Sequence, residues 1–155
     1  MKAFPTIAAA TAAADLAAKA AALRAFGGGR SVSVLPGFFD LRLVLNRGAA
    51  WGMLAGRRAA LVAVSAGMLA LLWADRRELA STRLSTAGAG LLAGGIAGNL
   101  FDRVFRGKVV DFLDFHWKTS WYFPVFNLAD AAITAGVALL LLSSLPWFRA
   151  KRQSR

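Results

Sequence analysis

The sequence contains no cysteine, which excludes disulfides and thiol chemistry. Its single histidine, His116, rules out a histidine-rich metal centre. Acidic residues are also scarce, since 8 Asp and Glu stand against 19 Lys and Arg, which gives a net charge of +11. Such an excess can indicate nucleic-acid binding. Here, however, most basic residues flank apolar blocks, where lipid phosphates are the nearest anions. We therefore expect membrane lipids, and no nucleic acid, as partners of these charges.

Apolar residues are what the chain has in excess, at 57% of its 155 residues. Soluble domains are usually about 45–50% apolar, and here the excess is gathered in blocks. We predict an α-helical integral membrane protein that forms a single membrane-embedded domain, residues 1–155. The four predicted transmembrane helices cover about residues 4–26, 59–74, 84–105 and 126–147.

The first apolar block begins like a signal peptide, but Asp15 and Lys19 interrupt it. A cleaved signal peptide needs an uninterrupted apolar run, so we expect this block to remain as the first transmembrane helix. Four spans place both termini on one side of the membrane. Basic residues occur on both sides, so charge alone does not fix the orientation.

The segment after the first helix alternates like a half-buried strand. Within Ser31–Leu45, apolar side chains from Phe39 onward fall on one face, and Asp40 and Arg42 fall on the other. A turn signal at Asn46-Arg47-Gly48 follows, and Ala49–Leu54 is interpreted as a returning strand. We therefore predict a small β-sheet over about residues 31–56. The segment 107–125 is interpreted as an aromatic-rich loop between the last two helices.

Polar residues gather where the third helix ends and the fourth begins. They form pairs three or four residues apart, which share a helix face: Asn99 with Arg103, Asp102 with Arg106, and Asn127 with Asp130. Each pair has a purely structural interpretation as well. The Asp102–Arg106 pair can be an end-of-helix contact. Asn127 can be a helix N-cap, with Asp130 in the first turn, where the helix dipole favours an acid.

Two aspartates, Asp111 and Asp130, are predicted to lie at the same membrane face because the segment between them is short. Two carboxylates in a partly desolvated site tend to share one proton. This is the state that an aspartic protease needs, because the ionised group activates water and the protonated one donates to the peptide carbonyl. We expect His116 to serve in packing. A carboxylate metal site would have few ligands, neutralised by Arg103 and Lys108, so we expect no metal and no cofactor.

Five sequence blocks resemble signal peptidase II, the bacterial lipoprotein signal peptidase, from Asp15 to the end of the fourth helix. The blocks are Asp15-x-x-x-Lys19, Asn46–Gly52, Gly94–Arg103, Gly107–Phe112 and Phe126–Asp130. The resemblance implies that Asp111 and Asp130 are the catalytic dyad. It implies supporting or substrate-binding roles for Asn46, Gly48, Asn99, Asp102, Arg103 and Asn127, and scaffold roles for Asp15 and Lys19.

The resemblance also implies a location and a substrate. The site would open at the outer face of the bacterial inner membrane, with both termini cytoplasmic and the sheet (31–56) and loop (107–125) extracytoplasmic. The substrate would be a diacylglyceryl-modified prolipoprotein, cleaved just before its lipidated cysteine. A globomycin-type cyclic peptide would inhibit the enzyme.

The alternative is a small proton-coupled transporter that uses intramembrane Asp and Arg as a relay. It predicts charges spread through the depth of the bilayer and helices interrupted at similar places in two halves of the chain. The charges here cluster at one end, apart from Asp15 and Lys19, and the sequence has no internal repeat. The peptidase is therefore the favoured hypothesis.

Overall fold

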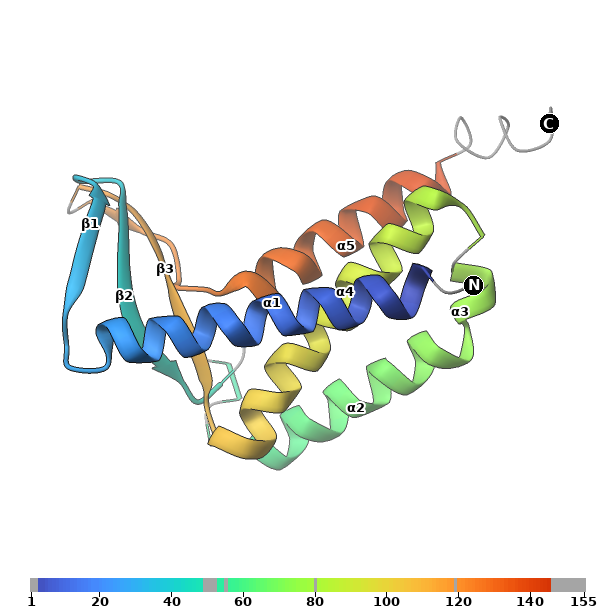
Figure 1. The fold of residues 1–155 in the computed structure, drawn as a ribbon, viewed down its shortest axis with the longest axis horizontal. Coiled ribbons are helices and arrows are strands. Elements are labelled where there is room, and N and C mark those ends of the chain that lie inside the picture. Colours follow the sequence, from blue (N-terminus) through green and yellow to red (C-terminus); the bar gives the residue numbers. More distant parts are fainter. Residues whose placement is uncertain (1–2, 49–52, 55, 80, 119, 146–155) are drawn as a thin grey trace.

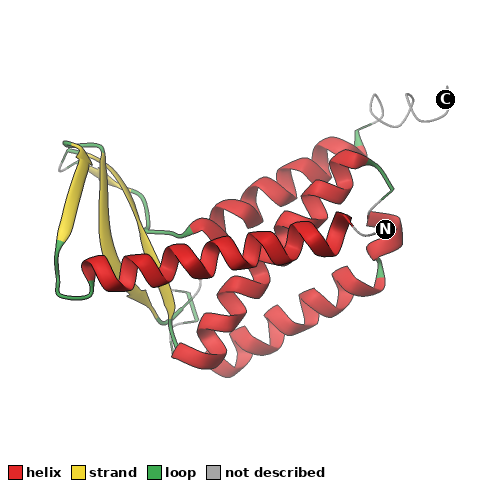
Figure 2. Cartoon of the chain, viewed as in Figure 1, coloured by secondary structure: helices red, strands yellow, loops and turns green. Residues whose placement is uncertain are grey.

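The computed structural model describes residues 3–48, 53–54, 56–79, 81–118 and 120–145. A bundle of helices carries a small β-sheet at one end (Figure 1), and Figure 2 shows the strands gathered at that end, where α1 reaches and contacts them. The helices are α1 (Ala3–Phe26), α2 (Arg58–Ala74), α3 (Arg76–Leu79), α4 (Arg83–Phe101) and α5 (Leu128–Ser144), and a π-helix, η2 (Asp102–Arg106), continues α4. The strands are β1 (Ser31–Leu35), β2 (Phe39–Asn46), β3 (Val109–Trp117) and β4 (Trp121–Tyr122).

Helix α4 is the centre of the bundle and contacts α1, α2 and α5. Small residues allow this close packing. A Cβ atom on Gly94 would lie 2.5 Å from the carbonyl oxygen of Ala8 in α1. One on Gly88 would lie 2.9 Å from the carbonyl oxygen of Gly136 in α5. Glycines at such crossings let helix backbones approach each other, as is common in membrane proteins.

Two helical segments are long and apolar enough to cross a membrane, namely α1 and the combined α4–η2 segment, Arg83–Arg106. Helices α2 and α5 are apolar but have only 17 residues each. Such a helix is about 25 Å long, against about 30 Å of hydrocarbon core. The structure thus supports two of the four predicted spans by length and composition. The predicted end of the fourth span, at residues 146–147, lies outside the described residues.

The sheet is antiparallel throughout, in the order β1-β2-β3-β4. The prediction of one strand over residues 31–45 was wrong, because Gly37, with φ +77°, turns the chain back and divides the segment into β1 and β2. The predicted returning strand, Ala49–Leu54, falls mostly outside the described residues, and its last two residues lie in a turn.

The prediction that residues 107–125 form a loop was also wrong, because they contain β3 and β4. Strand β3 is buried or half-buried from Val109 to His116, and only its last residue, Trp117, is exposed. A strand that is covered on both faces lacks the apolar–polar alternation by which strands are recognised in a sequence. Its pairing with β2 places Val44 opposite Asp111 and Asn46 opposite Val109, which brings Asn46 to the site described next.

Candidate active site

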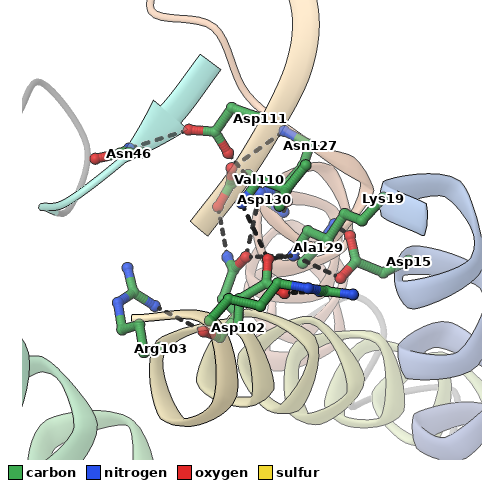
Figure 3. A network of polar contacts seen from close by, with 12 residues as sticks. Asp15, Lys19, Asn46, Asp102, Arg103, Val110, Asp111, Asn127, Ala129 and Asp130 are labelled. Atoms are coloured by element: carbon green, nitrogen blue, oxygen red, sulfur yellow. Dashed lines mark hydrogen bonds and ion pairs between the residues drawn. The ribbon is translucent and has the colours of Figure 1, made fainter. Parts of the chain in front are cut away.

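The polar side chains meet where the sheet joins the helical bundle (Figure 3). They come from α1, the end of β2, the α4–η2 junction, the start of β3 and the start of α5. Segments far apart in the sequence thus converge on one point, and the structure brings together all ten residues singled out from the sequence: Asp15, Lys19, Asn46, Gly48, Asn99, Asp102, Arg103, Asp111, Asn127 and Asp130.

Asp111 lies in β3 and is almost completely buried, with 1% of its surface exposed. Its Oδ1 accepts a hydrogen bond from Asn127 Nδ2 at 2.6 Å, and its Oδ2 accepts one from Asn46 Nδ2 at 3.0 Å. Burial, assisted by the nearby charge of Asp130, raises the pKa of Asp111 from 3.8 to about 7. Asp111 is therefore suited to hold a proton near neutral pH.

Asp130 lies in the first turn of α5 and is half-buried. It forms a capping box with Asn127: the backbone N–H of Asp130 donates to Asn127 Oδ1 at 2.9 Å, and Asp130 Oδ2 accepts from the backbone N–H of Asn127 at 3.2 Å. Asn99 Nδ2 donates to the other oxygen, Oδ1, at 2.8 Å. The N-cap interpretation of Asn127 is thus confirmed, and the same amide reaches Asp111 through its NH2 group.

Lys19 is completely buried beneath the two aspartates. Its ammonium group lies 2.7 Å from Asp15 Oδ2 and 3.2 Å from Asp102 Oδ2, and it donates to Asn99 Oδ1 at 2.8 Å. Because the amide oxygen of Asn99 accepts from Lys19, the amide NH2 group is turned toward Asp130. Lys19 therefore orients a donor to Asp130 without contacting Asp130 itself.

The two carboxylates that pair with Lys19 also bind the main chain next to the dyad. Asp15 Oδ1 accepts from the backbone N–H of Ala129 at 2.9 Å, and Asp102 Oδ2 accepts from the backbone N–H of Val110 at 3.0 Å. Each of these amides belongs to the residue immediately before a dyad aspartate. Sequence reasoning missed these contacts, because a backbone donor leaves no signal in residue type.

Arg103 and Gly48 complete the polar end of the site. Arg103 Nη2 donates to the carbonyl oxygen of Gly48 at 3.2 Å, and its Nη1 donates to that of Asn99 at 3.4 Å. The backbone N–H of Gly48 donates to Asn46 Oδ1 at 2.8 Å. This contact leaves the NH2 group of Asn46 free to bind Asp111. Asp102 forms the expected ion pair with Arg106, four residues further along η2.

A cavity of about 680 Å³ opens beside the dyad. Its polar end is formed by Asn46, Asn99, Arg103, Asp111 and Asp130. The remaining wall is mostly apolar and follows the segment before α5 and one face of α5 itself: Val109, Phe123, Pro124, Val125, Phe126, Ala131, Ile133, Thr134, Ala135 and Ala138. The cavity can therefore hold an apolar chain that ends at a pair of carboxyl groups.

His116 lies outside this cavity lining, further along β3. Its Nε2 is 3.2 Å from Asp40 Oδ2, and its ring stacks on Tyr122. Its contacts are those of a packed side chain, as expected. Within the described part of the chain, no group of three or more His, Cys, Asp or Glu side chains is arranged to hold a metal ion.

Fold and site together define a class: a helical membrane protein with a carboxylate pair at the head of an apolar cavity. The sequence comparisons identify the family within this class. The model of the family described as signal peptidase (SPase) II matches residues 7–146, and the chain belongs to this family. It is a family of aspartic peptidases, and membership implies the removal of signal peptides from lipoproteins.

Individual relatives agree with this assignment. The lipoprotein signal peptidase of Pseudomonas paraeruginosa is 41% identical over 129 residues, covering 79% of this chain and 74% of the relative. The lipoprotein signal peptidase of Burkholderia vietnamiensis is 41% identical over 142 residues, covering 89% of this chain and 84% of the relative. A solved bacterial membrane enzyme has a TM-score of 0.80 and 31% identity, covering 89% of this chain and 84% of its own.

Proposed function

We propose that this protein is a membrane aspartic endopeptidase that removes the signal peptide from diacylglyceryl-modified prolipoproteins, cleaving just before the lipidated cysteine. Asp111 and Asp130 are its catalytic dyad. One observation carries this assignment: both carboxyl groups line the same cavity, and the side chain of Asn127 contacts both residues. The family match favours this reaction over a proton-coupled transporter.

The chemistry follows from the different surroundings of the two groups. Asp111 holds the proton, because burial raises its pKa to about 7. Asp130, ionised, takes a proton from a water molecule as the water oxygen attacks the scissile carbonyl carbon. Asp111 donates its proton to the carbonyl oxygen, which gives a neutral tetrahedral intermediate. The C–N bond then breaks as the amine of the lipidated cysteine takes the proton held by Asp130, and the carboxyl product returns a proton to Asp111.

The amides support this division of roles. Asn99 donates to Asp130, and Asn127 and Asn46 donate to Asp111. These donors hold each carboxyl group in one orientation. Because the donors are already in place, no free energy is spent on reorganising them during the reaction. Arg103, at the same end of the cavity, supplies positive charge.

The apolar cavity wall suits the substrate, because a signal peptide is apolar and the diacylglyceryl group keeps the cleavage point at the membrane surface. We propose four membrane spans, with α2 and α5 crossing beside α4. The ends of α1 and α5 remote from the sheet lie at the same end of the bundle (Figure 1), which fits both termini on the cytoplasmic side and the site at the outer face of the inner membrane. A globomycin-type peptide would occupy the same cavity, and surrounding lipids would contact the apolar helices.

The test is cleavage of a diacylated model prolipoprotein by the purified protein. Asp111→Asn and Asp130→Asn should each abolish cleavage, since an amide can neither activate water nor share the proton. Asp75→Asn is the matched control, because its exposed carboxylate lies at the end of α2 remote from the site. If a dyad variant kept more than about a tenth of the wild-type rate, an effect of only about 1.4 kcal/mol, that residue would not belong to the pair.

A further inference from the structure

The π-helix η2 is bound from outside by a residue that the site description does not use. Arg58, the first residue of α2, donates from Nε to the carbonyl oxygen of Arg103 at 2.6 Å and from Nη2 to that of Val104 at 2.7 Å. Its guanidinium group also faces Gly107, the left-handed residue that ends η2 with φ +74°. One side chain thus binds two successive carbonyl groups at the end of a transmembrane segment.

These carbonyl groups need such a partner. The last carbonyls of a helix have no donor within the helix, and a basic side chain can supply one. A π-helical turn is rare and occurs mostly as a single-turn bulge in an α-helix, frequently at a functional site. The planar fork of an arginine matches two neighbouring acceptors, whereas a lysine presents a single point donor.

The position of η2 matters because consecutive residues at its start serve both parts of the site. Asp102 faces the buried network, where it binds Lys19 and the backbone of Val110. Arg103 faces the cavity that contains the dyad. The carbonyl of Arg103 is one of the two groups that Arg58 binds, so Arg58 fixes the backbone from which the Arg103 side chain extends.

We propose that Arg58 is a positioning residue, which holds η2 so that the guanidinium of Arg103 stays beside Asp111 and Asp130. This inference rests on the proposed function for its kinetic consequence only. The binding of η2 by Arg58 can be tested without any substrate.

The first experiment is hydrogen–deuterium exchange of the full chain in detergent micelles. Arg58→Ala should raise the exchange rate of the backbone amides of residues 102–108. The matched control is Arg57→Ala, which removes an adjacent exposed arginine whose side chain has no hydrogen bond or ion pair among the described residues. Unchanged exchange at 102–108 in Arg58→Ala would overturn the proposal, whether or not the protein cleaves prolipoproteins.

The second experiment is kinetic. Arg58→Ala should lower kcat by roughly threefold to tenfold, the size expected for losing a hydrogen-bonded positioning contact, with KM changed less than about twofold. Arg58→Lys should recover only part of the loss, because it can bind one carbonyl. Arg57→Ala should match the wild type. In an Arg103→Lys background, Arg58→Ala should cause little further loss of kcat. Arg58 is proposed to act by positioning the guanidinium of Arg103, which this background already lacks.

Three results would overturn this role: a normal kcat in Arg58→Ala, full recovery in Arg58→Lys, or an equal loss with and without the Arg103→Lys change. If the wild type itself does not cleave the diacylated substrate, the proposed function fails instead. The exchange measurement then still decides whether Arg58 holds η2.

Discussion

Replacing Asp111 by asparagine should destroy activity. The free energy of unfolding of this variant, compared with that of the wild type at the same pH, should increase as the pH rises. Asp111 has an ordinary pKa of 3.8 when exposed and about 7 in the folded protein. Between these values the folded state holds a proton that the unfolded state has lost. The contribution of Asp111 to the free energy of unfolding of the wild type therefore falls as the pH rises toward 7, and levels off above it. The uncharged amide of Asp111→Asn escapes this penalty.

The size of the effect follows from the same shift. Each pH unit between the two pKa values changes the free energy of unfolding by about 1.4 kcal/mol. From about pH 5 to about pH 7 the variant should gain about 2 kcal/mol relative to the wild type, because Asp111 is already half ionised at about pH 7. The amide also carries a cost that does not depend on pH. Its NH2 group cannot accept a hydrogen bond, so Asn46 or Asn127 loses an acceptor, at about 1–3 kcal/mol.

The measurement is the thermal unfolding midpoint of both proteins in the same detergent at about pH 5 and about pH 8, with Asp75→Asn as control. The difference between variant and wild type should shift in favour of Asp111→Asn by several degrees at the higher pH, and the control should show no such shift. A difference that is the same at both pH values would refute the argument that burial holds a proton on Asp111. It would also remove the reason for choosing Asp111 as the proton donor.

Three further outcomes are expected. Lys19→Met should lower the free energy of unfolding by about 3–5 kcal/mol, because it leaves the buried carboxylate of Asp15 without its cation and removes one of the two cations that pair with Asp102; a thermal midpoint equal to that of the wild type would contradict this. Asn99→Ala should slow cleavage by roughly tenfold to a thousandfold through loss of one oriented donor to Asp130, as measured by initial rates. Cleavage should continue in EDTA, and activity that is lost on chelation and restored by a divalent ion would instead indicate a metal site.

The sequence predicts the helices and the polar residues of the site well. Helix α2 was expected at 59–74 and lies at Arg58–Ala74, because a long apolar run between charged residues has few other structures available. The π-turn at η2 could not be predicted, since α- and π-helical turns use the same residue types. Two of its carbonyls are bound by Arg58, which is distant from them in the sequence.

The sheet was the least predictable part, for a related reason. Strand β3 is enclosed by neighbours from distant segments, so its sequence does not alternate. Its pairing with β2 nevertheless places Asn46 against Asp111. Residue types thus predict which side chains take part in the site, whereas the backbone contacts that hold them depend on tertiary structure.

The charges of the site explain why the dyad should hold a single proton. Beneath it, Asp15 and Asp102 are matched by Lys19 and Arg106, so this scaffold has no net formal charge. Among the described residues that line the cavity, the charged groups are the two dyad carboxyls and Arg103. A doubly ionised dyad would leave the partly desolvated site with a net negative charge, and a doubly protonated one would leave the cation without a partner. With one proton shared, the dyad carries one negative charge and the cavity as a whole is neutral, which is the least costly state in a low-dielectric site. The same state has one carboxylate to activate water and one carboxylic acid to protonate the peptide carbonyl.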